Sequence, residues 1–172
     1  MKIRIAPYFI IIYVLAFIIF VILISYFWQK NRKTPEQPIN FSHQIHVSKV
    51  GLPCTHCHTT VEKSTAAGIP SVETCMTCHK AVKKESPEIQ KLTKYWENKQ
   101  PVPWQRVYRL PARKYVYFSH KRHIKANLEC VNCHGNVEIM SIIKRVPKLE
   151  MGWCMSCHKA KNVSIDCATC HK

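Results

Sequence analysis

The chain opens with one long apolar run, and polar residues dominate the remainder. Between residues 5 and 28, 22 of the 24 residues are apolar and none is charged. A helix of this length reaches about 36 Å at about 1.5 Å per residue, which exceeds the hydrocarbon thickness of a membrane. Aromatic residues, which favour the membrane interface, stand near both ends of the run: Tyr8, Tyr26 and Trp28. The pattern predicts a transmembrane helix within residues 1–28.

A cleaved signal peptide is the alternative explanation of this run, because Lys2 and Arg4 precede it. Signal peptides, however, have apolar regions of about 7–15 residues that end at small side chains. Here the run is longer and ends on bulky residues, Phe27 and Trp28, so we predict an uncleaved signal anchor. Basic residues flank the run on both sides and therefore do not fix its orientation.

Apolar residues are sparse after the anchor. Outside residues 5–28, 48 of the other 148 residues are apolar when the cysteines are left aside. So small a share gives a thin conventional core and excludes a large enzyme with its own apolar active-site cleft. The Lys-rich segment 80–98 has charges at helical spacing after Ser86 and Pro87, which predicts an exposed helix.

All ten cysteines belong to five copies of the motif C-x-x-C-H. This is the attachment signature of c-type haem, in which two thiols form thioethers with the vinyl groups and the adjacent histidine ligates the iron. Two thiols three residues apart can reach two substituents on one porphyrin edge, and the next residue then falls under the metal. The motifs comprise Cys54, Cys57 and His58; Cys75, Cys78 and His79; Cys130, Cys133 and His134; Cys154, Cys157 and His158; and Cys167, Cys170 and His171.

Other uses of cysteine pairs explain this pattern less well. Disulfides and thioredoxin-like redox pairs give no reason for a histidine after every pair, and zinc sites typically place their histidines further away. The sequence therefore predicts five covalently attached haems with the five motif histidines as proximal ligands. Covalent attachment takes place on the outer side of an energy-transducing membrane. We accordingly expect a cytoplasmic N-terminus in the inner or plasma membrane, with the haem domain on the periplasmic side.

Four of the other five histidines occur in a repeated phrase, F-S-H-x-x-H, ahead of a haem motif. The phrase occupies residues 41–46 and 118–123, and its first histidine precedes the next cysteine by 11 and 10 residues respectively. Residues three apart are neighbours on a helical turn, so one histidine can face its own haem and the other the next haem. His56 lies inside a motif and is not expected to reach an iron. The expected distal ligands are His43, His46, His120 and His123.

The second half of the chain, from Phe118 to Lys172, resembles the trihaem cytochrome c7 and cytochrome c3 family. It shares the F-x-H-x-x-H phrase, three haem motifs and the ending Cys-Ala-Thr-Cys-His-Lys, and residues 41–80 match the same pattern without the last haem. The resemblance implies that the first histidine of each phrase ligates the first haem and the second histidine the next. The implied pairs are His43 with His58, His46 with His79, His120 with His134, and His123 with His158.

In that family a histidine just before the second haem motif ligates the last haem. Here residues 150–152 read Glu-Met-Gly, so the resemblance makes Met151 the ligand expected opposite His171, with an offset that differs by one residue. Met140, Met155 and Met76 are weaker alternatives, because methionine more often fills gaps in packing. A methionine ligand raises the reduction potential, so the last haem is expected to have the higher potential.

The predicted fold is a single N-terminal transmembrane helix followed by a multihaem cytochrome c domain of class III, c7/c3-like. This domain is expected to have little regular secondary structure, mostly short helices and loops around five haems. The expected order is the anchor at residues 1–28, a stalk at 29–40, a dihaem half at 41–80, a helix and Pro-rich connector at 81–117, and a trihaem half at 118–172.

Nearly the whole chain resembles the membrane-anchored pentahaem cytochrome c subunit of alternative complex III (ActA-like), a quinol:electron-acceptor oxidoreductase. The N-terminal helix, the segment 100–120 and the phrase Met-Gly-Trp-Cys at 151–154 carry this likeness. It implies an electron-transfer subunit, with no catalytic residue of its own, that relays electrons from a quinol-oxidising core to a periplasmic cytochrome c or similar carrier. The implied partners are an iron–sulfur subunit, a quinol-binding membrane subunit and a monohaem cytochrome.

Two other functions stay open from the sequence. One is a membrane tetrahaem or pentahaem quinol dehydrogenase of the NapC/NrfH type that acts alone, and the other is a free periplasmic shuttle, which an uncleaved anchor disfavours. The net charge of +16 is also typical of proteins that bind nucleic acid. Ten haem propionates would reduce that charge to about +6, so nucleic-acid binding is not expected.

Overall fold

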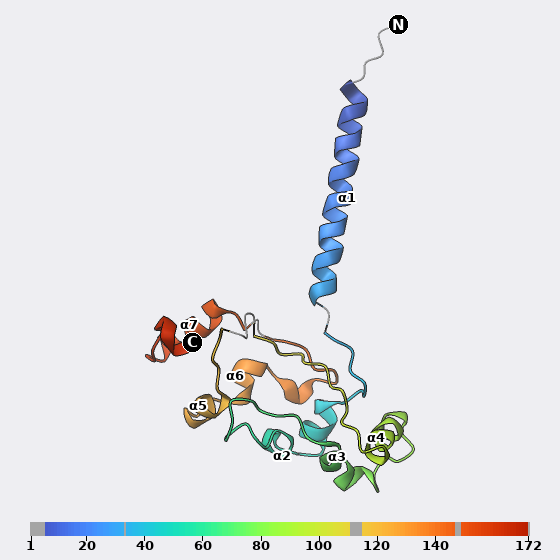
Figure 1. Cartoon of the computed structure of the whole chain (residues 1–172), viewed down its shortest axis with the longest axis vertical. Helices are drawn as coiled ribbons and strands as arrows, with labels where there is room; N and C mark the ends of the chain where they lie inside the picture. Colours follow the sequence, from blue (N-terminus) through green and yellow to red (C-terminus); the bar gives the residue numbers. More distant parts are fainter. Residues whose placement is uncertain (1–5, 33, 111–114, 147–148, 172) are drawn as a thin grey trace. The chain divides into compact units, whose positions relative to one another are not determined.

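The computed structural model describes residues 6–32, 34–110, 115–146 and 149–171 (Figure 1). The chain divides into two compact units, Met1–Thr34 and Pro35–Lys172, which are described separately. Lys2, Arg4 and Lys33, together with residues 111–114 of the predicted connector, lie outside the described residues.

Helix α1 runs from Ala6 to Arg32 and makes up the described part of the first unit. Its segment Tyr8–Trp28 is long and apolar enough to cross a membrane, and none of it is buried within the structure. A helix that is apolar on every side has no polar face to turn toward water, so its side chains need lipid or protein around them. The helix passes residue 28 and includes the first four residues of the predicted stalk.

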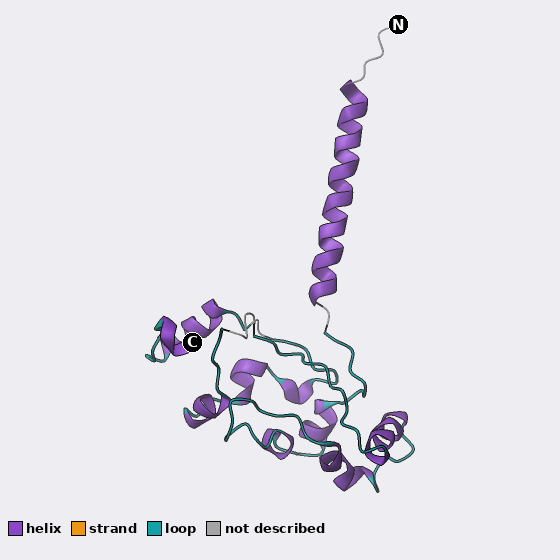
Figure 2. Ribbon diagram, viewed as in Figure 1, coloured by secondary structure: helices purple, strands orange, loops and turns teal. Residues whose placement is uncertain are grey.

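The second unit consists of short helices joined by loops, and Figure 2 shows no strand among the described residues. This confirms the predicted scarcity of regular secondary structure. Val116 and His171 form an isolated antiparallel bridge. The helices are η1 (Gln44–Lys49), α2 (Cys54–Cys57), α3 (Val72–His79), α4 (Pro87–Glu97), α5 (His120–Lys125), α6 (Cys130–His134), η2 (Val137–Ile139), α7 (Met151–Ala160) and α8 (Cys167–Cys170).

One small apolar cluster supports the second unit where α3 packs against α4. Partly buried aromatic side chains, including Trp96 and Trp104, surround it. Apart from this cluster, Val61 is the other buried apolar side chain among the described residues. A core of this size agrees with the low apolar content of the sequence after the anchor. The buried members are Ile39, Val72, Met76, Leu92 and Val102.

Helix α4 confirms the helix expected in the segment 80–98. It begins at Pro87, whose missing amide hydrogen has no intrahelical partner to lose at that position. Leu92 faces the apolar cluster, while Glu88 and Lys91 form an ion pair of 2.8 Å at the surface. The helix therefore has one buried stripe and an otherwise solvated surface.

The F-S-H-x-x-H phrase forms a helical turn twice, with different geometry. The first copy forms the π-helix η1, and the second forms the α-helix α5. In both copies a leucine amide then donates to the carbonyl of the second histidine, Leu52 to His46 at 3.0 Å and Leu128 to His123 at 3.3 Å. The first copy has one more residue than the second between its second histidine and this leucine, and the wider π turn accommodates that residue. The first cysteine of the following motif therefore has the same position relative to the leucine in both copies.

Candidate haem-attachment sites

Each C-x-x-C-H motif is built on a short helix, because α2, α3, α6, α7 and α8 carry one motif each. Two thiols three residues apart therefore lie on the same side of a helical turn, and the histidine follows directly. All ten cysteines lie within the described residues and are unpaired. Each pair is thus free to form two thioether bonds to one porphyrin edge.

Three histidine pairs lie at the separation that two axial ligands of one iron require. Two metal–nitrogen bonds of about 2 Å, with about 1 Å more from each nitrogen to its ring centre, place trans imidazoles about 6 Å apart. The pairs are those that the cytochrome c7 resemblance implied, and iron ligation by them stays a prediction. The ring centres are 6.1 Å apart for His46 and His79, 6.3 Å for His120 and His134, and 6.1 Å for His123 and His158.

His43 and His58 form the fourth implied pair. Burial, followed by the charges of His58 and His46, lowers the pKa of His43 to about 4. His43 therefore lies near His58 and is a neutral imidazole at physiological pH, the form that binds a metal. The Nδ1 atom of His43 is buried and has no hydrogen-bond partner. In this it differs from most of the other expected histidine ligands, whose Nδ1 atoms lie beside a backbone carbonyl.

Seven of the expected histidine ligands place Nδ1 within hydrogen-bond distance of a backbone carbonyl. A carbonyl oxygen only accepts, so Nδ1 must carry the proton and Nε2 keeps its lone pair for a metal. The chain thereby fixes both the tautomer and the ring orientation. The contacts are His46 to Ser42 (2.8 Å), His58 to Gly68 (2.8 Å), His79 to Val82 (3.1 Å), His120 to Thr65 (3.0 Å), His123 to Ser119 (2.8 Å), His158 to Ser164 (2.8 Å) and His171 to Tyr115 (3.1 Å).

The phenylalanine of each repeated phrase packs against both of its histidines. Phe41 lies 4.3 Å from His46 and 4.9 Å from His43 between ring centres, stacked on the first and edge-on to the second. Phe118 repeats the arrangement with the two histidines of α5. No role for these rings was predicted from the sequence, although the presence of phenylalanine in both copies of the phrase could have indicated one.

Tyr108 of the connector supports His134 in a similar way. Its ring packs edge-on to the imidazole with 4.5 Å between the ring centres. Its hydroxyl lies 2.8 Å from the carbonyl of His134, and it accepts from the amide of Val146 at 3.3 Å. The connector therefore helps to orient the histidine of the third motif, a contribution that the Pro-rich pattern did not predict.

The fifth site is less complete than the other four. The carbonyl of Tyr115 holds His171 from one side, while Met151 begins α7 with 62% of its side chain exposed. Met76 is buried in the apolar cluster, as expected for a packing residue. His56 is exposed on α2. Ligation by Met151 therefore stays a prediction.

Neighbouring thiols give an order to the five motifs. Burial and then a nearby thiol raise the pKa of a cysteine at each junction, and thiols influence one another in this way only at short range. These shifts make the first motif a neighbour of the second and third, and the fourth a neighbour of the third and fifth. The neighbouring thiols are Cys75 and Cys57 for the second and first motifs, Cys130 and Cys54 for the third and first, Cys133 and Cys157 for the third and fourth, and Cys154 and Cys170 for the fourth and fifth.

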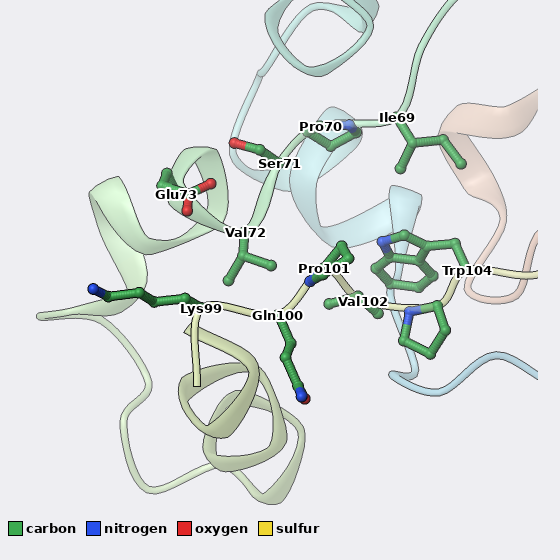
Figure 3. A pocket seen from close by; sticks show the side chains of 11 residues that line it. Ile69, Pro70, Ser71, Val72, Glu73, Lys99, Gln100, Pro101, Val102 and Trp104 are labelled. Atoms are coloured by element: carbon green, nitrogen blue, oxygen red, sulfur yellow. The ribbon is translucent and has the colours of Figure 1, made fainter. Parts of the chain in front are cut away.

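Two surface hollows lie beside α3. The first, of about 540 Å³, is bordered by the start of α3 and by residues 99–104, and Figure 3 shows Val72, Val102 and Trp104 at its wall. It includes none of the motif residues. The second, of about 470 Å³, is lined by His79, by Lys80 and Lys84 of the turn after α3, and by Lys94 and Glu97 of α4. The lysines therefore give the surroundings of the second motif a positive charge.

Comparison with known proteins is consistent with this donor set. The sequence pattern described as cytochrome c7 and related cytochrome c matches residues 39–96 and 116–172. A protein of Nitratidesulfovibrio vulgaris (strain Hildenborough), named the multihaem cytochrome c subunit of menaquinone reductase, is 37% identical over 100 residues. These residues are 58% of this chain and 46% of that protein, so the chain spans about half the length of this relative. Free thiol pairs beside imidazoles with an available Nε2 are the donors that c-type haem needs.

Proposed function

The chain belongs to the family of cytochrome c7 and related cytochromes c, and on this premise we propose that it is the multihaem electron-transfer subunit of a membrane quinol:electron-acceptor oxidoreductase. The observation that carries the proposal is the set of histidine pairs about 6 Å apart beside free thiol pairs. Family membership makes the chain a c-type cytochrome with covalently bound haem. The number of haems, the ligands and the complex are parts of the proposal.

We propose five haems, one on each motif. The motif histidines would serve as proximal ligands, with His43, His46, His120 and His123 opposite the first four and Met151 opposite His171. A bound haem c would supply one-electron transfer, and an iron held by two of these side chains would have no position left for a substrate. The chain's own contribution is to fix seven of these nine imidazoles through a backbone carbonyl and to hold neighbouring motifs close together. No catalytic residue is assigned, and quinol chemistry would belong to another subunit.

The order of the motifs supports a relay rather than five independent centres. His43 at the N-cap of η1 and His46 within it would serve the first two motifs, and the two histidines of α5 would serve the third and fourth. The chain can therefore hold its haems in one file, with the motif on α3 at one end and the motif on α8 at the other.

We further propose that α1 anchors the chain in the inner membrane with residues 35–172 on the periplasmic side. The anchor would keep the relay beside a quinol-binding membrane subunit, an iron–sulfur subunit and a monohaem cytochrome, as in alternative complex III. The relative named as a menaquinone reductase subunit supports a quinone-linked complex, although its name describes electron flow toward the quinone. A row of haems held by these histidines could transfer electrons in either direction. The reduction potentials of the partner proteins would decide which way the electrons move.

Purification in mild detergent tests this assignment. We expect the haem-stained chain to co-purify with at least one further membrane subunit, and the complex to oxidise menaquinol with reduction of a small cytochrome. The isolated chain should accept electrons from a chemical reductant but not from menaquinol. Menaquinol oxidation by the isolated chain would instead support a self-sufficient quinol dehydrogenase of the NapC/NrfH type.

Met151→His tests the ligand of the fifth haem. Imidazole donates more electron density to iron than a thioether does, so the substitution should lower the potential of one haem and leave the other four unchanged. The measurement is a spectroscopic redox titration of the full chain. Met155→His on the same helix is the matched control and should shift none of the five. An unchanged titration for Met151→His, or a shift for Met155→His alone, would remove Met151 from the ligand set.

A further inference from the structure

One loop touches a histidine of the first haem motif and a histidine of the second repeated phrase. The loop runs from Thr60 to Gly68, directly after the first motif. The carbonyl of Gly68 accepts from Nδ1 of His58 at 2.8 Å, and the carbonyl of Thr65 accepts from Nδ1 of His120 at 3.0 Å. His58 is expected to ligate the first haem, and His120 the third.

The loop also holds the backbone of α5. The amide of His120 donates to the carbonyl of Thr65 at 3.2 Å, and the amide of Lys121 donates to the carbonyl of Ser64 at 3.1 Å. These bonds join residues more than fifty positions apart in the sequence. The start of α5, and with it the imidazole of His120, is thereby docked on the loop that follows the first motif.

Internal bonds make the loop compact. The Thr60 carbonyl accepts from the amides of Lys63 and Ser64 at 3.0 and 2.8 Å, and the Thr60 hydroxyl donates to the carbonyl of Ala66 at 3.0 Å. The side chain of Val61 is buried below it. The Thr60 hydroxyl thus closes the loop between the carbonyls that hold the two histidines.

The backbone conformation and surroundings of Gly68 in this loop favour glycine over larger residues. Its φ of +73° favours glycine, and an added Cβ would lie 2.7 Å from the hydroxyl oxygen of Thr60. The closeness of Gly68 to Thr60 lets the Gly68 carbonyl face His58. The positions of the Gly68 and Thr65 carbonyls therefore depend on the same side chain, that of Thr60.

We propose that the loop Thr60–Gly68 is a positioning element that sets the reduction potentials of the first and third haems together. The inference rests on the proposed function, because it takes His58 and His120 as iron ligands. A carbonyl that accepts strongly from Nδ1 makes the imidazole a better donor and lowers the potential of its haem. A looser loop weakens both contacts, so both potentials rise.

Thr60→Val in the full chain tests the coupling, because it removes the hydroxyl with little change in shape. Thr93→Val on α4 is the matched control, since Thr93 makes the same kind of bond, to the Ile89 carbonyl at 2.9 Å. Redox titrations of both variants are compared with those of His43→Met and His120→Met, which identify the steps of the first and third haems. We expect Thr60→Val to raise these two steps and leave the other three unchanged, and Thr93→Val to shift none.

Gly68→Ala is a second route to the same result, because the added Cβ displaces the loop from the other side. It should raise the same two steps. A shift of one haem alone, of none, or of other haems overturns the coupling. Failure of the proposed function would give different results. The unmodified chain would carry fewer attached haems than proposed. Alternatively, the low-spin spectrum would be unaltered by His43→Met and His120→Met, which would show that these histidines are not ligands.

Discussion

Replacing both cysteines of the third motif, Cys130→Ser with Cys133→Ser, should remove one haem and divide the relay in two. The third motif lies between the first and the fourth in the order of neighbouring thiols. Its loss leaves the first two motifs on one side of the gap and the last two on the other. Electron transfer across the gap should fall by orders of magnitude, because no attached group bridges it.

The matched control is Cys75→Ser with Cys78→Ser, at the end of the file. This variant also loses one haem, but its four remaining motifs still adjoin one another. When electrons enter at one end of the file in a stopped-flow experiment, all four haems of the control should be reduced in a rapid phase. In the third-motif variant only two haems should be reduced in that phase. Equally rapid reduction of all four haems in both variants would mean that the motif order is wrong.

Preventing haem attachment should leave residues 35–172 without a stable fold. The described residues of this unit include six buried apolar side chains, which are too few to offset the conformational entropy of ordering so long a segment. Many other apolar side chains of this unit, such as Val131 and Ile142, are exposed to solvent. The porphyrins are therefore expected to supply most of the interior.

The measurement is limited proteolysis with circular dichroism on the full chain in detergent, made with and without covalent haem. The chain without haem should lose the helical signal of its second unit and be digested rapidly up to the membrane helix. The haem-loaded chain should resist digestion. A protease-resistant second unit without haem would contradict the view that porphyrins form its core.

The candidate haem-attachment sites could be proposed from the sequence because their chemistry belongs to side chains at fixed local spacing. The C-x-x-C-H pattern locates the attachment helices, and the H-x-x-H phrase locates η1 and α5. Helices α1 and α4 follow from equally local patterns of hydrophobicity and charge. In each case the interacting residues lie within a few positions of one another.

The hydrogen bonds that orient the histidine rings were not predictable from the sequence. Their Nδ1 partners are backbone carbonyls, such as those of Gly68 and Thr65, and every residue type has a carbonyl. The contact from Thr65 to His120 also spans the two halves of the domain, so no local pattern reveals it. The π-helix likewise depends on how the chain takes up one additional residue between His46 and Leu52.

The intact mass of the purified chain, measured under denaturing conditions, tests the central claim most directly. Thioether-linked haems survive denaturation, whereas haems bound only through iron are lost. With one haem on each motif, the measured mass should equal that of the polypeptide plus five haems. A mass with four haems or fewer would contradict the five-haem relay and would show that at least one C-x-x-C-H motif serves another purpose.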